Sequence, residues 1–177
     1  MGNFITLLLF SLFFLAACTT VNIRDYAGSS PVFRLEEYFA GKSTGWGVVL
    51  DRSGGVVKQF RVDLDGSVEG NTLTLFEKFF YSDGSSDERT WTVNKTGENN
   101  YEGFAADVIG KAVGISSGNA LNWSYTLLLP ARGTEFSIRF DDWMFLQDEE
   151  TLINKAIMSK FGFQVGEVLI FFKKDKK

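Results

Sequence analysis

The sequence contains no histidine, and it has only one cysteine and two prolines among its 177 residues. Without histidine, the chain cannot form a Ser-His-Asp triad, a Cys-His pair, or a histidine-ligated zinc or haem site. A single cysteine excludes an internal disulfide and a thiolate metal cluster. We therefore expect no metal site, no resident cofactor and no catalytic residue of these kinds.

Positive charge is also scarce. The 18 basic and 22 acidic side chains give a net charge of −4 (18 − 22), and the basic residues form no stripe of the kind that binds a phosphate backbone. Nucleic acid is therefore not expected as a partner. The length predicts one domain, in which 18 phenylalanines and 18 glycines supply apolar bulk and turns.

Residues 4–17 form one long apolar run, FITLLLFSLFFLAA, which contains no charged side chain. The run is shorter than the ~20 apolar residues that a membrane-spanning helix needs, but it fits the core of a signal peptide. We expect a signal-peptide helix at residues 1–17, a polar tether at residues 18–32, and one folded domain at residues 33–177.

The end of this run, Leu15-Ala16-Ala17-Cys18, resembles the lipobox of bacterial lipoproteins. In that family the chain is cut just before the cysteine, whose sulfur and new amino group are acylated, and several acyl chains anchor a protein stably. The resemblance implies that Cys18 is lipidated and that a membrane is a partner. The residue after the cysteine is Thr19 and not an aspartate. This resembles the rule for sorting to the outer membrane, where the protein faces the periplasm.

Two other interpretations of the amino terminus stay open. Gly2 and Thr6 formally fit an N-myristoylation signal. Alternatively, the apolar run is a buried helix and Cys18 is an inert thiol. The lipoprotein interpretation is favoured because it explains both the apolar run and the position of the single cysteine.

Beyond Pro31, apolar and polar residues alternate with a period of two, and turns that contain glycine, such as Asp65-Gly66, interrupt the alternation. Asp-Gly and Gly-Gly pairs supply the positive φ that tight hairpins need. A short helix is expected at residues 34–39, and residues 151–162 fit either a strand or a short helix. We predict strands near residues 44–51, 56–65, 71–82, 87–95, 100–107, 110–116, 120–129, 134–147, 151–160 and 165–173.

The short links between these strands make consecutive strands antiparallel, because a parallel crossover needs a dozen residues or more. An all-β, up-and-down meander of about 8–10 strands must hide its edges, and closure into a lipocalin-like barrel does so. A barrel of this size has room for one small ligand. The main alternative is a sandwich of two sheets.

Several charged residues lie on the apolar face of the predicted strands. Glu77 lies on the same strand face as leucine and aromatic residues, and Asp142 lies on the same face as Phe140 and Met144. Arg89 shares a face with Trp91, two residues further along the chain. The most aromatic face belongs to residues 120–129. We predict six barrel-lining residues: Glu77, Arg89, Trp91, Trp123, Tyr125 and Asp142.

An inward charge must be paired or solvated, because an unpaired buried carboxylate costs several kcal/mol. Pairing of Arg89 with Glu77 or with Asp142 would meet that need. One interpretation is a small-molecule site, since an apolar pocket with a few convergent polar groups is typical of one. The other is a structural ion pair, or charges at the barrel rim in water.

Several strings carry a family resemblance. They are Trp46-Gly47 with Asp51-Arg52, Gly118-Asn119-Ala120 leading to Trp123-Ser124-Tyr125, Asp141-Asp142-Trp143-Met144, and Asn154-Lys155-Ala156 with Met158 and Lys160-Phe161-Gly162. Together they resemble a family of uncharacterised Gram-negative outer-membrane lipoproteins, catalogued as domain of unknown function 3833. The resemblance runs from the lipobox to about Phe172. It implies a lipocalin-like barrel and no catalytic residues.

These observations favour a membrane-anchored, periplasm-facing lipoprotein that binds a lipid or another apolar small molecule in a β barrel. An alternative is a non-catalytic structural or assembly partner of an envelope complex, which predicts a filled core and an exposed apolar patch. A histidine-independent enzyme is the third hypothesis. Asp141 and Asp142 do not support it, because adjacent residues of a strand point to opposite faces.

Overall fold

The computed structural model describes residues 21–131 and 134–176. The predicted signal peptide at residues 1–17 and the predicted lipidation site at Cys18 lie outside the described residues. Within the described ranges, no helix is both long enough and apolar enough to cross a membrane.

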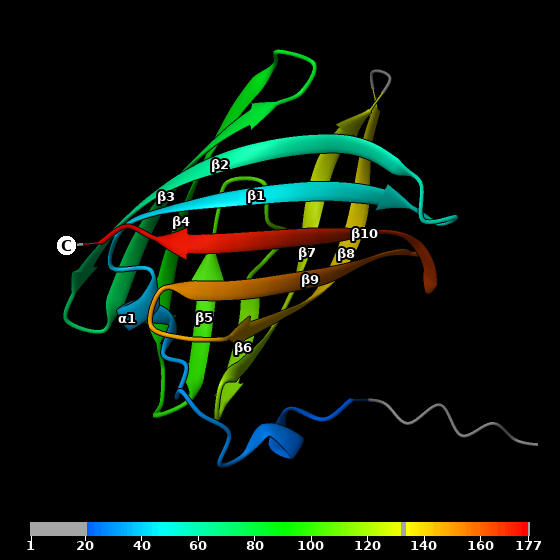
Figure 1. The fold of residues 1–177 in the computed structure, drawn as a ribbon. Helices are drawn as coiled ribbons and strands as arrows, with labels where there is room; N and C mark the ends of the chain where they lie inside the picture. The colour runs from blue at the N-terminus through cyan, green and yellow to red at the C-terminus, as the bar shows by residue number, and fades with distance from the viewer. Residues whose placement is uncertain (1–20, 132–133, 177) are drawn as a thin grey trace, which may run out of the picture.

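The described chain forms one closed antiparallel barrel (Figure 1). Each strand pairs with the next along the sequence, and the last pairs with the first, so the ring has the order β1-β10-β9-β8-β7-β6-β5-β4-β3-β2. The prediction of an all-β, up-and-down barrel of about 8–10 strands is confirmed, and the two-sheet alternative is wrong. The strands are β1 (Gly41–Asp51), β2 (Val56–Glu69), β3 (Thr72–Tyr81), β4 (Ser86–Lys95), β5 (Asn100–Phe104), β6 (Ala112–Ser117), β7 (Ala120–Ala131), β8 (Thr134–Leu146), β9 (Thr151–Lys160) and β10 (Phe163–Lys174).

The alternation of the sequence sets the inner and outer faces of the wall. On β3, Leu73 and Leu75 are buried while Thr74 between them is exposed, as the two-residue period of a strand requires. β9 is a strand and not a helix, and Leu152, Asn154 and Ala156 are its buried positions. Closure follows from the pairing of β1 with β10, which runs from Ser43↔Lys174 to Asp51↔Gly166 and leaves no open edge.

A short helix closes one end of the barrel. The helix α1 (Leu35–Tyr38) lies within the predicted range 34–39, and both of its terminal side chains are buried. Tyr38 Oη donates a hydrogen bond to the backbone oxygen of Glu150 at 2.9 Å, which ties α1 to the β8–β9 turn. Glu36 accepts from Tyr101 Oη at 2.9 Å and pairs with Lys95 Nζ at 2.5 Å. These contacts hold α1 across this end of the barrel, so that α1 closes it.

The segment around Tyr26 lies on the outer wall. The 3-10 helix η1 (Ile23–Tyr26) begins after Asn22, whose side chain accepts a hydrogen bond from the backbone of Arg24 at 3.0 Å. The ring of Tyr26 packs on Trp143 and Phe145 of β8, with centroids 5.9 and 5.4 Å away. This part of the predicted tether therefore follows the barrel surface.

The barrel wall is irregular beside β4. The ladder between β4 and β5 covers only Thr92–Lys95, because β5 ends at Phe104 and not near residue 107 as predicted. The β5–β6 connection, residues 105–111, turns instead toward β7, where Ile109 N donates to Thr126 O and Leu128 N to Asp107 O, both at 2.9 Å. This connection thus extends the wall next to β7.

Candidate functional site

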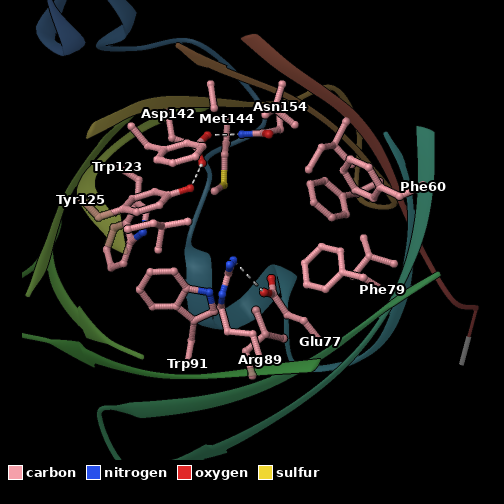
Figure 2. Close-up of a pocket in the computed structure, with 18 of the residues that line it drawn as sticks. Phe60, Glu77, Phe79, Arg89, Trp91, Trp123, Tyr125, Asp142, Met144 and Asn154 are labelled. Carbon is pink, nitrogen blue, oxygen red and sulfur yellow. Dashed lines mark hydrogen bonds and ion pairs between the residues drawn. The ribbon is translucent and has the colours of Figure 1, made fainter. Parts of the chain in front are cut away.

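The barrel encloses a cavity of about 340 Å³, a volume within the range of roughly 300–1,000 Å³ that is usual for small-molecule sites. Leu35, the first residue of α1, and Phe39, which follows α1, line its closed end. Lys58 and Tyr81 line it as well; the ammonium of Lys58 lies 3.7 Å from the centre of the Tyr81 ring. Figure 2 looks into the cavity, with α1 behind it. Its lining includes all six residues predicted to line the barrel: Glu77, Arg89, Trp91, Trp123, Tyr125 and Asp142.

Aromatic rings form one wall of the cavity. Trp91 of β4 contacts Trp123 and Tyr125 of β7 edge-on, at centroid distances of 5.9 and 5.5 Å. Tyr125 stacks on Phe140 of β8 at 5.0 Å, with the ring planes 3° apart. Edge-to-face and offset-stacked pairs of this kind each add about 0.5–1.5 kcal/mol beyond the burial of area. These contacts therefore stabilise the arrangement of the rings in this wall.

A second aromatic group lies on the opposite side of the cavity in Figure 2. Phe60 of β2 contacts Phe79 of β3 at 5.8 Å, and Phe79 stacks with Tyr81 at 6.2 Å. Gly47 of β1 makes room for Phe60, because a Cβ atom at Gly47 would lie 2.3 Å from that ring. A flat apolar ligand, or an acyl chain, would contact rings on both sides.

Two glycines position Trp123. A Cβ atom at Gly114 or at Gly103 would lie 2.3 or 2.4 Å from the indole ring, well inside van der Waals contact. Gly114 of β6 is the direct cross-strand partner of Trp123. The bare backbone of β5 and β6 therefore lets the indole lie flat against the wall and leaves the centre of the barrel open.

Arg89 lies between two carboxylates. Its Nε and Nη2 donate to Oδ2 of Asp107 at 3.0 and 2.7 Å, and its Nη1 lies 3.7 Å from Oε2 of Glu77. Glu77 and Arg89 are direct partners in the β3–β4 ladder, whereas Asp107 comes from the β5–β6 connection. Of the two carboxylates predicted to pair with Arg89, the structure brings Glu77 to it.

Asp142 is held by uncharged groups. Its Oδ1 accepts a hydrogen bond from Asn154 Nδ2 of β9, and its Oδ2 accepts one from Tyr125 Oη of β7 at 3.3 Å. Asp142 is only 6% exposed, while the adjacent Asp141 is exposed on the outer face. The two aspartates therefore point to opposite sides of the wall, as predicted.

Burial makes the carboxyl groups of Glu77 and Asp142 weaker acids than they are in water. Burial raises the pKa of Glu77 to about 7, although the positive charge of Arg89 opposes the rise. Burial also raises the pKa of Asp142 to about 7, against the hydrogen bonds from Asn154 and Tyr125. Near neutral pH each carboxyl group can therefore either donate or accept a hydrogen bond.

Two polar residues that contact the predicted lining residues, Asp107 and Asn154, were not predicted as site residues from the sequence. Asp107 lies in a connection without alternation, so parity gives no signal there. Asn154 shares the parity of Leu152 and Ala156, and an unambiguous strand at residues 151–160 would have placed it inside. Within the described ranges, no group of three or more Asp, Glu or Cys side chains is arranged to hold a metal ion.

A closed barrel with one plugged end, an apolar cavity and a few convergent carboxyl groups defines the class: the chain is an up-and-down β barrel with an internal cavity. Residues 12–174 match the family described as protein of unknown function (DUF3833), and the chain belongs to this family. No curated protein matches the sequence.

Two solved structures share the barrel fold. The S-type phycobiliprotein lyase CPES from Guillardia theta superposes with a TM-score of 0.57 at 8% identity, over 80% of this chain and 91% of that chain. A DUF3598-family protein of unknown function from Nostoc punctiforme superposes with a TM-score of 0.52 at 11% identity, over 83% of this chain and 51% of that chain. At these identities the similarity concerns the fold alone.

Proposed function

We propose that this protein binds an apolar small molecule, such as a lipid, inside its barrel. The observation that carries the proposal is the cavity of about 340 Å³ between two aromatic groups. A barrel that served only as a scaffold would gain stability by filling this space with side chains, because an internal void forfeits dispersion contacts. The barrel similarity to a phycobiliprotein lyase is compatible with small-molecule binding.

The test is to extract the full-length protein gently from membranes and to measure its mass under native conditions. We expect a population that carries one extra non-covalent small molecule. After that molecule is stripped, N-phenyl-1-naphthylamine, a neutral probe that fluoresces in apolar surroundings, should bind with a stoichiometry of one. A protein that carries no extra mass and does not bind the probe would refute the proposal.

We further propose that the barrel is anchored to the outer membrane through lipidated Cys18 and faces the periplasm. An apolar row on the outer wall supports a position close to a lipid surface. In this row Trp46 pairs with Phe171, Phe171 with Ile153, and Ile153 with Phe145 across four adjacent strands. Trp46 is 50% exposed, Phe171 45% and Ile153 44%. The row ends at Phe145, on which Tyr26 packs. Tyr26 follows Cys18 by eight residues in the sequence (26 − 18).

The same outer row favours the second candidate function, an assembly partner in an envelope complex. A photo-crosslinking residue in place of Trp46 separates the two roles of the row. Crosslinks to phospholipid support the membrane position, and a reproducible protein partner supports the assembly role. The matched control is the same residue in place of Thr92, which is exposed on β4, three strands away from β1 around the barrel.

A further inference from the structure

The positive charges that line the cavity are already engaged. Only Lys58 and Arg89 supply them among the described lining residues. Arg89 donates two hydrogen bonds to Asp107, and Lys58 Nζ lies 3.8 Å from Asp83 of the β3–β4 turn. Neither of these carboxylates lines the cavity. An anionic head group would therefore have to compete with a fixed carboxylate for either cation.

The negative groups in the cavity and directly beside it can accept further hydrogen bonds. Oε2 of Glu77 and Oδ1 of Asp107 are buried and accept no hydrogen bond within the described residues. Asp142 receives its two hydrogen bonds from uncharged donors, so no positive charge balances it. Among the described residues, Arg89 is the one cation within ion-pair distance of these three carboxyl groups, and it reaches Glu77 and Asp107 but not Asp142. Because unsatisfied buried polar groups are costly, the unmet need of Glu77, Asp107 and Asp142 is for hydrogen-bond donors and for further positive charge.

Glu77 and Asp142 both point into the cavity, from β3 and from β8, with open space between their walls (Figure 2). We propose that the cavity takes an amphiphile with a cationic, hydrogen-bond-donating head, an ammonium or amidinium group, which lies between Glu77 and Asp142. The apolar part of the ligand contacts the aromatic rings on both sides. This inference rests on the proposed function and narrows it to a ligand class. Two carboxylates offset the cost of taking one cation out of water, which a single partner rarely does.

The experiment compares three amphiphiles that share a ten-carbon chain: decylamine, decanol and decanoate. Each competes with N-phenyl-1-naphthylamine for the stripped wild-type protein at pH 8, below its micelle concentration. We expect decylamine to displace the probe at a concentration at least about tenfold lower than decanoate does, a difference of about 1.4 kcal/mol. Decanol should fall between them.

Variants assign the preference to the two carboxyl groups. Glu77→Gln and Asp142→Asn should each reduce the preference for decylamine over decanol, and the double variant should bring it to within about twofold. Asp141→Asn, which removes the adjacent outward carboxylate, should leave the preference intact. Since the comparison of the three amphiphiles uses wild-type protein, it holds even if a variant fails to fold.

The outcomes separate the two proposals. If the probe binds but decanoate displaces it as well as decylamine does, or if none of the three competes, the inference about the head group is wrong while the binding function stands. If the probe itself does not bind, the binding function is wrong. Decylamine preference that survives in the double variant places the head elsewhere and also overturns the inference.

Discussion

Arg89 and Asp107 are joined by two hydrogen bonds to a single carboxylate oxygen, 3.0 Å from Nε and 2.7 Å from Nη2. The pair bridges the place where β4 has already lost its ladder with β5. It therefore fastens the β5–β6 connection, residues 105–111, to the barrel wall. The same guanidinium reaches Glu77, so the fastening of this connection and the charge of the cavity depend on one side chain.

Asp107→Asn should loosen this connection. The amide can still accept one hydrogen bond, but it supplies no negative charge to Arg89, so we expect a loss of about 1–2 kcal/mol in the free energy of unfolding. Hydrogen–deuterium exchange should accelerate at Ile109 and Leu128, whose amides bond across to β7 and to Asp107. Asp65→Asn is the control, because it removes a more exposed ion pair with Lys42, away from this connection, and should cost less than about 1 kcal/mol. Unchanged exchange at Ile109 would contradict the fastening role.

The contribution of Asp142 to the free energy of unfolding should fall as the pH rises from about 4 to 7. The pKa of Asp142 is about 7 in the fold, where burial raises it, against an ordinary value of 3.8, so in this window the folded state holds a proton that the unfolded state has lost. The stabilisation by that proton is complete at low pH and is gone above the folded pKa. Glu77 shifts in the same direction.

Asp142→Asn isolates the contribution of that one carboxyl group. At pH 8 the variant should be more stable than wild type by about 2–4 kcal/mol, because a shift of roughly three pKa units is worth about 4 kcal/mol at most. At pH 4 the advantage should nearly vanish. Urea unfolding at the two pH values measures it, and Asp141→Asn on the outer face is the matched control. An advantage that does not grow with pH would show that Asp142 ionises in the fold as it does in water.

The strands could be predicted because they depend on the local alternation of apolar and polar residues. All ten strands lie close to their expected positions, and the parity that placed Glu77 among Leu75 and Phe79 is the parity of the inner wall. The expected end of the fifth strand near residue 107 was wrong. Asp107 and Ile109 bond to β7 and not to β4, and this choice depends on contacts far apart in the sequence.

In the candidate site, too, local alternation predicts some features, and contacts between residues far apart in the sequence decide the others. The inward direction of Arg89 follows from alternation, but its partner Asp107 is set by the path of a connection. The room for Trp123 depends on Gly103 and Gly114 facing its indole, which only the register of β5, β6 and β7 decides. The packing of Tyr26 on β8 is likewise a long-range contact that a polar amino-terminal segment does not reveal.

Cys18→Ser tests the anchor. If the lipobox resemblance holds, the wild-type protein incorporates labelled palmitate and sediments with membranes, whereas the variant incorporates none and keeps its apolar leader uncut. The control is Ser11→Ala, a change inside the same apolar run that leaves the lipobox intact. Palmitate labelling that persists in Cys18→Ser would rule out this cysteine as the acylation site.

Val168→Phe tests whether the cavity is an open space that a ligand needs. Val168 lines the cavity from β10, and the next residue, Leu169, lies 37% exposed on the outer face. Added volume in a well-packed core costs about 1–3 kcal/mol, so a loss below about 1 kcal/mol in urea unfolding would indicate free space. Because the ring would occupy the space that the ligand needs, we expect affinity for N-phenyl-1-naphthylamine to fall about tenfold or more. Leu169→Phe makes a similar change outside and should bind the probe as wild type does; equal probe affinity in both variants would place the ligand somewhere other than this cavity.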